Sequence, residues 1–131
     1  MNRPTLIDTH ALLWLVENDP RLGTRAREII VNGDSPLLFS HVSVWELVVK
    51  HTTGKLKLTL PISEFIEQRI TAAGIELLPI RLAHILMYDE LPLHHRDPFD
   101  RLLAAQCLSD GMSILTRDEL FDRYGVETVW D

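Results

Sequence analysis

Four carboxylates recur at comparable positions along this chain, each just after an expected strand or in the first turn of an expected helix. They are Asp8, Glu46, Asp100 and Asp118. If two such groups lie about 5 Å apart, they repel each other by roughly 3 kcal/mol at an effective dielectric of about 20, and a divalent cation removes that repulsion. Oxygen ligation by carboxylates and water suits Mg²⁺ or Mn²⁺. Because such a metal polarises a phosphoryl oxygen and activates water, the implied chemistry is metal-assisted hydrolysis of a phosphodiester bond.

Each of the four acids also has a structural explanation. Asp8 suits the N-cap of one expected helix and Asp100 the first turn of another, since both positions favour negative charge at the positive end of a helix dipole. Ser43 and Glu46 match a capping box, with Ser at the N-cap and Glu three residues later. Asp118 suits a helix dipole as well. Capping explains any single acid, and it is their joint occurrence that favours a shared site.

Short apolar runs alternate with helical segments, and this alternation determines where the acids meet. We expect strands at 5–7, 37–39, 77–80 and 113–116 and an edge strand at 128–130. We expect helices at 9–16, 24–32, 43–51, 61–74, 81–90 and 118–124, and another from Pro98, where Asp97 serves as the cap. The pattern predicts an α/β sandwich with a largely parallel sheet. Since ligands bind outside the carboxyl ends of such strands, the four acids are expected to converge there.

Composition limits the classes of function. The 131 residues suit one domain, residues 1–131, with 46% hydrophobic and 24% charged residues. A formal net charge of −6 argues against binding nucleic acid through a broad basic field, so a polyanionic substrate would need local cations or a bound metal. No apolar run is long enough for a membrane span, and no signal peptide is evident. Cys107 is the lone cysteine, which fits a reducing cytoplasm.

Four motifs in register give the chain its resemblance to a known family. They are Leu6-Ile7-Asp8-Thr9-His10, Ser43-Val44-Trp45-Glu46, His95-Arg96-Asp97-Pro98-Phe99-Asp100-Arg101 and Leu115-Thr116-Arg117-Asp118. With them the sequence resembles PIN-domain nucleases, specifically the VapC-type toxins of bacterial type II toxin–antitoxin systems, over nearly its whole length. The resemblance implies a single PIN domain, a three-layer sandwich with a central, mainly parallel sheet flanked by helices.

The same resemblance implies an activity and partners. These are Mg²⁺- or Mn²⁺-dependent endoribonuclease activity on structured RNA such as tRNA or rRNA, a cognate VapB-type antitoxin that blocks the site, and a homodimer. By position, Asp8, Glu46 and Asp100 match the three central acids of the family's site, and Asp118 matches the fourth, more variable one.

Several polar residues beside the acids are candidates for substrate contact. They are Lys50, Arg96, Arg101, Thr116 and Arg117. The four cations can bind the RNA backbone or stabilise charge on the phosphate, but local charge balance with the carboxylates explains them equally well. Thr116 can hold a metal-bound water or orient a carboxylate.

Two other functions compete with a nuclease. A non-catalytic PIN-like module that binds RNA or protein would have no need to retain mutually repelling carboxylates, which the chain keeps. An aspartyl-phosphate phosphatase would need a second Asp two residues after Asp8, where His10 stands instead.

Overall fold

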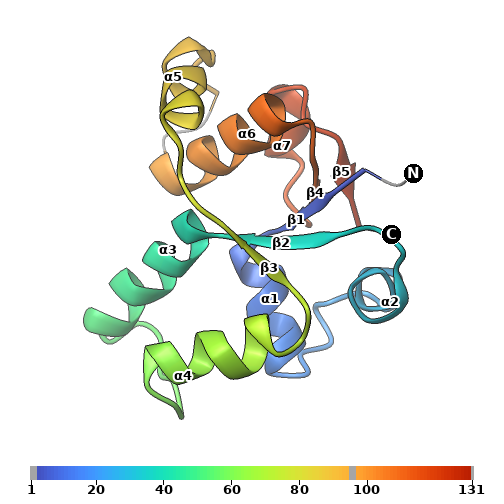
Figure 1. The fold of residues 1–131 in the computed structure, drawn as a ribbon, viewed down its shortest axis with the longest axis vertical. Coiled ribbons are helices and arrows are strands. Elements are labelled where there is room, and N and C mark those ends of the chain that lie inside the picture. The colour runs from blue at the N-terminus through green and yellow to red at the C-terminus, as the bar shows by residue number, and fades with distance from the viewer. Residues whose placement is uncertain (1–2, 95–96, 131) are drawn as a thin grey trace.

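Five strands form one parallel sheet in the computed structural model, which describes residues 3–94 and 97–130. The sheet order is β3-β2-β1-β4-β5, and every neighbouring pair is parallel (Figure 1). The strands are β1 (Thr5–Ile7), β2 (Leu37–Ser40), β3 (Glu76–Leu78), β4 (Ser113–Leu115) and β5 (Thr128–Val129). The predicted strands and the edge position of the last one are confirmed. The third strand ends earlier than expected, because Pro79 has no backbone N–H to continue the ladder.

Helices cover both faces of the sheet, so the predicted three layers are confirmed (Figure 1). The helices are α1 (Thr9–Val16), α2 (Thr24–Asn32), α3 (His41–Thr52), α4 (Ile62–Ile66) with a π-helical continuation η1 (Glu67–Thr71), α5 (Leu82–Glu90), α6 (Pro98–Asp110) and α7 (Leu120–Arg123). Within the described ranges, no helix is long and apolar enough to cross a membrane.

Alternation along the central strands divides the core in two. Ile7 and Leu115 pack with residues of α1, α2, α4 and η1, whereas Leu6 and Ile114 pack with residues of α6 and α7. All four side chains are fully buried. Because successive side chains of a strand point to opposite faces, both faces of the central strands are apolar and need a layer of helices.

The start of α3 differs from the prediction. Ser43 is not its N-cap, because the helix begins at His41 and the Ser40 hydroxyl accepts the Val42 N–H at 2.9 Å. Ser43 lies in the first turn, and its hydroxyl oxygen accepts a hydrogen bond from Thr9 at 2.7 Å. Glu46 therefore lies in the second turn, where capping no longer explains it.

Candidate active site

Asp8 and Thr116 join the carboxyl ends of the two central strands. Asp8 directly follows β1 and Thr116 directly follows β4, and these strands are paired in parallel. The Thr116 hydroxyl donates to Asp8 Oδ2 at 2.9 Å, whereas the Asp8 side chain makes no capping bond to α1. Asp8 is 8% exposed, and burial raises the pKa of its carboxyl above the ordinary value, with Glu46 adding to the rise and Thr116 and His10 opposing it. The hydroxyl therefore orients a buried carboxylate.

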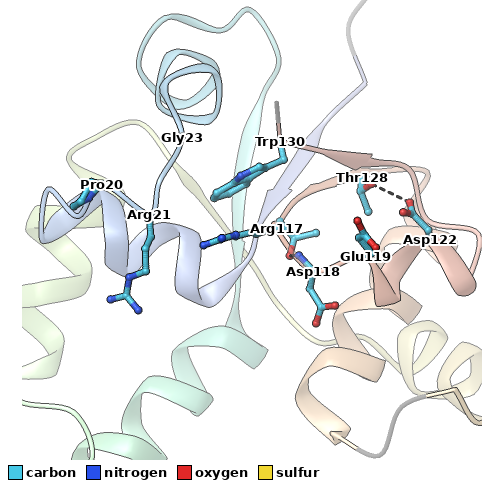
Figure 2. A pocket seen from close by; sticks show the side chains of 10 residues that line it. Pro20, Arg21, Gly23, Arg117, Asp118, Glu119, Asp122, Thr128 and Trp130 are labelled. Carbon is cyan, nitrogen blue, oxygen red and sulfur yellow. Dashed lines mark hydrogen bonds between the residues drawn. The ribbon is translucent and has the colours of Figure 1, made fainter.

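Asp118 is tied to the same threonine from the other side. Its backbone N–H donates to Thr116 Oγ1 at 3.1 Å, and its Oδ1 accepts the Leu120 N–H at 2.9 Å. Thr116 thus bridges Asp8 and Asp118 through one hydroxyl group. These hydrogen bonds hold the loop between β4 and α7, and the side chains of Arg117 and Asp118 extend from this loop just after the end of β4 (Figure 2).

Asp100 enters the site from the first turn of α6. The cap of that helix is Asp97, which accepts the Phe99 N–H at 2.9 Å, as the sequence predicted. The pKa of Asp100 is raised to about 8, first by burial and then by the charges of Asp8, Asp97, Glu46 and Asp118. The other three predicted acids therefore all act on Asp100 electrostatically.

Glu46 is buried beside a cation. It is 6% exposed, and Lys50 lies one helical turn later with Nζ 3.1 Å from Glu46 Oε2. The same Nζ is 3.5 Å from His10 Nε2. Lys50 thus balances the charge of Glu46, one of the two roles predicted for it.

Three of the acids share a cavity. Asp8, Asp100 and Asp118 line a space of about 320 Å³ together with Arg117. Glu46 is coupled to this group through the charges that raise the pKa values of Asp8 and Asp100. The topology thus brings together acids that are up to 110 residues apart in the chain.

The donor set fits a hard divalent cation. It offers oxygen ligands, and the repulsion that contributes to the raised pKa of Asp100 would be relieved by a cation among the carboxylates. In the part of the chain that the structure describes, no three His, Cys, Asp or Glu side chains already stand close enough to ligate one ion together. Mg²⁺ is typically held by only one or two carboxylates plus waters, so the residues present suit it without a closed cage.

Arg101 does not face the acids. It is 6% exposed, and its guanidinium donates to the carbonyl oxygens of Pro92 at 2.9 Å and Tyr88 at 3.2 Å. It also lies over the Tyr88 ring, 4.5 Å from the centroid. The expectation that Arg101 contacts substrate disagrees with this geometry, because its donors already fix the end of α5 to α6. Arg96, another predicted contact, falls outside the described residues.

Sequence reasoning missed Arg21 and Trp130 as neighbours of the acids. Both line the cavity that holds Asp8 and Asp118. Arg21 comes from the connection between α1 and α2, and Trp130 directly follows β5. No motif distinguishes these residues, and only the position of β5 beside β4 brings Trp130 to this edge.

Comparisons with known proteins agree with this architecture. The family model described as the PIN domain matches residues 5–127. Among curated proteins, none matches the sequence. The structure is similar to "VapBC2 from Rickettsia felis bound to a DNA fragment from their promoter", with 15% identity and a TM-score of 0.73, covering 98% of this chain and 99% of that one.

Two further solved structures are similar at comparable levels. VapBC-1 from nontypeable Haemophilus influenzae has 16% identity and a TM-score of 0.67, with 96% of each chain covered. FitAcB from Neisseria gonorrhoeae has 16% identity and a TM-score of 0.66, with 95% of each chain covered. At such identities the likeness concerns the fold.

Proposed function

The chain belongs to the PIN domain family, and from this premise we propose that it is a Mg²⁺- or Mn²⁺-dependent endoribonuclease toxin of the VapC type. Its substrate is structured RNA such as tRNA or rRNA, and residues 1–131 act as a single PIN domain. The observation that carries the proposal is the convergence of Asp8, Asp100 and Asp118 on one cavity, where burial and the charges of neighbouring acids raise the pKa of Asp100. Carboxylates held together against their own repulsion are suited to a divalent cation.

In this proposal Asp8, Glu46, Asp100 and Asp118 hold the metal. When bound, the metal polarises a phosphoryl oxygen and lowers the pKa of water that attacks the phosphodiester. The Thr116 hydroxyl keeps the Asp8 carboxylate in one orientation through its 2.9 Å hydrogen bond. Asp100 would be a ligand in its ionised form, which a cation at this position would favour.

The cations at the site have separate tasks. Lys50 lies 3.1 Å from Glu46 and balances the negative charge of that buried carboxylate. Arg117 is exposed beside Asp8, Asp100 and Asp118, and binds an RNA phosphate next to the bond that is cleaved. Arg101 has no part in catalysis.

The proposed partners are a cognate VapB-type antitoxin and a second copy of the chain. The antitoxin blocks the acidic site. The homodimer is supported by apolar side chains at helical spacing on α5, where Leu82, Ile85 and Leu86 are 69%, 52% and 58% exposed. Gel filtration with light scattering tests the dimer, and Leu86→Lys is expected to give monomers.

Cleavage of total cellular RNA tests the enzymatic proposal. Purified, antitoxin-free protein is incubated with Mg²⁺ or with EDTA, beside Asp8→Asn and a control, Asp34→Asn, which changes an exposed acid that does not line the cavity. We expect discrete fragments with the wild type and Asp34→Asn in Mg²⁺ alone, and none with Asp8→Asn. Fragments that persist in EDTA would contradict metal dependence.

A titration with Mn²⁺ separates the remaining alternative. Metal binding without cleavage would point to a narrower substrate than those in total RNA. A folded protein that neither binds metal nor cleaves RNA would support the non-catalytic module instead.

A further inference from the structure

The acidic cavity continues into a larger groove. The groove measures about 860 Å³ and lies against the cavity that contains Asp8 and Asp100. Arg21, Arg117, Asp118 and Trp130 line both spaces. Figure 2 shows Arg117 and Trp130 extending in the same direction from the ends of the sheet, toward the connection that carries Pro20 and Arg21. The groove therefore starts at the carboxylates and leads away from them past an arginine and a tryptophan.

Arg117 supplies an available positive charge in this groove. Its side chain is exposed, and it forms no hydrogen bond or ion pair with any residue in 3–94 or 97–130. The chain carries a net charge of −6, and Arg117 lines a cavity with three carboxylates, yet it pairs with no carboxylate among the described residues. A guanidinium in this position suits the phosphate of a ligand, because it can bind two phosphate oxygens at once.

Arg21 differs from Arg117 because it already forms an ion pair. It pairs with Asp19 at 2.7 Å, and its guanidinium carbon lies 5.0 Å from the centroid of the Trp14 ring. Asp19 and Trp14 thus hold Arg21 as part of the wall of the groove. Of the two described arginines that line the groove, Arg117 is therefore the one available to a ligand.

Trp130 supplies a positioned aromatic ring. It is half-buried and packs edge-on against Trp14, with ring centroids 6.0 Å apart. Its position directly after β5 brings it to the same edge of the sheet as Thr116 and Asp8. An indole that is supported on its edge and also lines two open spaces is suited to stacking against a planar group.

We propose that this groove is a nucleotide subsite for substrate RNA, in which Arg117 binds a phosphate and Trp130 stacks against an unpaired base. The assignment of RNA as the ligand rests on the proposed function. The volume of about 860 Å³ is within the range of small-molecule sites and accommodates a nucleotide. Because the groove opens from the carboxylates, the nucleotide it holds is adjacent to the phosphodiester that is cleaved.

The test is binding of a fluorescently labelled, single-stranded RNA of ten nucleotides, followed by anisotropy in Mg²⁺. All proteins carry Asp8→Asn so that the RNA stays intact. A second probe has the same sugar-phosphate backbone without bases. Trp130→Ala is expected to weaken RNA binding by about 5- to 150-fold, the range of one base–aromatic stack, and to leave binding of the baseless probe unchanged.

Two further variants keep the test decisive if Trp130→Ala is unstable. Arg117→Gln changes an exposed side chain, and it should weaken the binding of both probes to the same extent. It should also reduce the slope of log affinity against log salt concentration by about 0.7, the contribution of one phosphate contact on a single strand. Trp45→Ala removes an exposed tryptophan that lines neither space, and it should leave both probes unaffected.

Several outcomes would overturn the subsite. One is an Arg117→Gln protein that binds both probes as tightly as the parent does. Another is a folded Trp130→Ala protein whose affinity for the two probes is unchanged or falls equally. The others are an Asp8→Asn parent that binds no RNA, and a loss of affinity for the RNA probe alone in Trp45→Ala instead of Trp130→Ala. A cleavage assay on wild-type protein separates this result from the proposed function. If the wild type cleaves RNA but Trp130→Ala does not change RNA affinity, the subsite alone is rejected. If Trp130→Ala weakens binding of the RNA probe alone but the wild type does not cleave RNA, the nuclease alone is rejected.

Discussion

Replacing Asp100 by Asn should stabilise the metal-free protein, and the gain should grow with pH. The pKa of Asp100 is about 8 in the folded chain against an ordinary value of 3.8, chiefly because of burial and then the charge of Asp8. The folded chain therefore binds the proton more tightly than the unfolded chain. The corresponding stability is fully present below pH 3.8 and is lost as the pH rises through about 8. Asparagine keeps the shape of the side chain but has no proton to lose.

The size of the effect follows from the two pKa values. At 1.36 kcal/mol for each tenfold change in proton affinity, a rise from 3.8 to about 8 corresponds to at most roughly 6 kcal/mol at full ionisation. Partial exposure lowers this figure, and the loss of a carboxylate from the first turn of α6 opposes it by up to about 1 kcal/mol. We expect a net gain of about 2 to 4 kcal/mol at pH 9. For a chain of 131 residues this is a rise in Tm of about 7 to 14 °C.

The assay is thermal unfolding in EDTA at pH 5, 7 and 9, with Asp34→Asn as the matched control. The advantage of Asp100→Asn should be small at pH 5 and largest at pH 9, and the control should follow the wild type throughout. Saturating Mg²⁺ should remove the advantage, because the metal stabilises the wild-type carboxylates. An equal difference at every pH, or a variant less stable than wild type at pH 9, would refute the reasoning and assign Asp100 to the helix dipole.

The other predictions concern single contacts at or near the site. Thr116→Val should lower metal-free stability by about 2 kcal/mol, because it removes the hydroxyl that donates to the buried Asp8 carboxylate, and Thr116→Ser should restore the stability; chemical denaturation measures both. Mg²⁺ at a hundred times its Kd should stabilise the wild type by about 2.7 kcal/mol and Asp8→Asn far less, as thermal scans with and without metal would show. Arg101→Met should destabilise the fold by about 2 to 3 kcal/mol, because it removes charged donors from the carbonyls of Tyr88, Leu91 and Pro92. The folded fraction should bind RNA normally in an anisotropy titration, and weaker RNA binding would restore a substrate role for Arg101.

Much of the fold follows from local patterns in the sequence. The apolar runs that precede Asp8 and Thr116 form paired central strands, and the Asp97-Pro98 start of α6 matches the structure because a cap and a proline act within one turn. Ser43 misled the prediction for α3, since Ser40 three residues earlier provides an equally good cap at the end of β2. Local chemistry allows both starts, and only the length of the strand decides between them.

The sequence by itself determined which residues are proposed to carry the chemistry, namely four acids, each at the carboxyl end of a strand or early in a helix. The tertiary structure decided how they are used. Thr116 bridges Asp8 and Asp118, Lys50 balances Glu46, and Arg101 is turned toward backbone carbonyls. It also set Trp130 beside the acids. The physical reason is that the hydrogen bond from Thr116 to Asp8 and the position of Trp130 depend on the pairing of β1 with β4 and of β4 with β5. This pairing joins segments far apart in the chain, whereas helix starts and strands depend mainly on neighbouring residues.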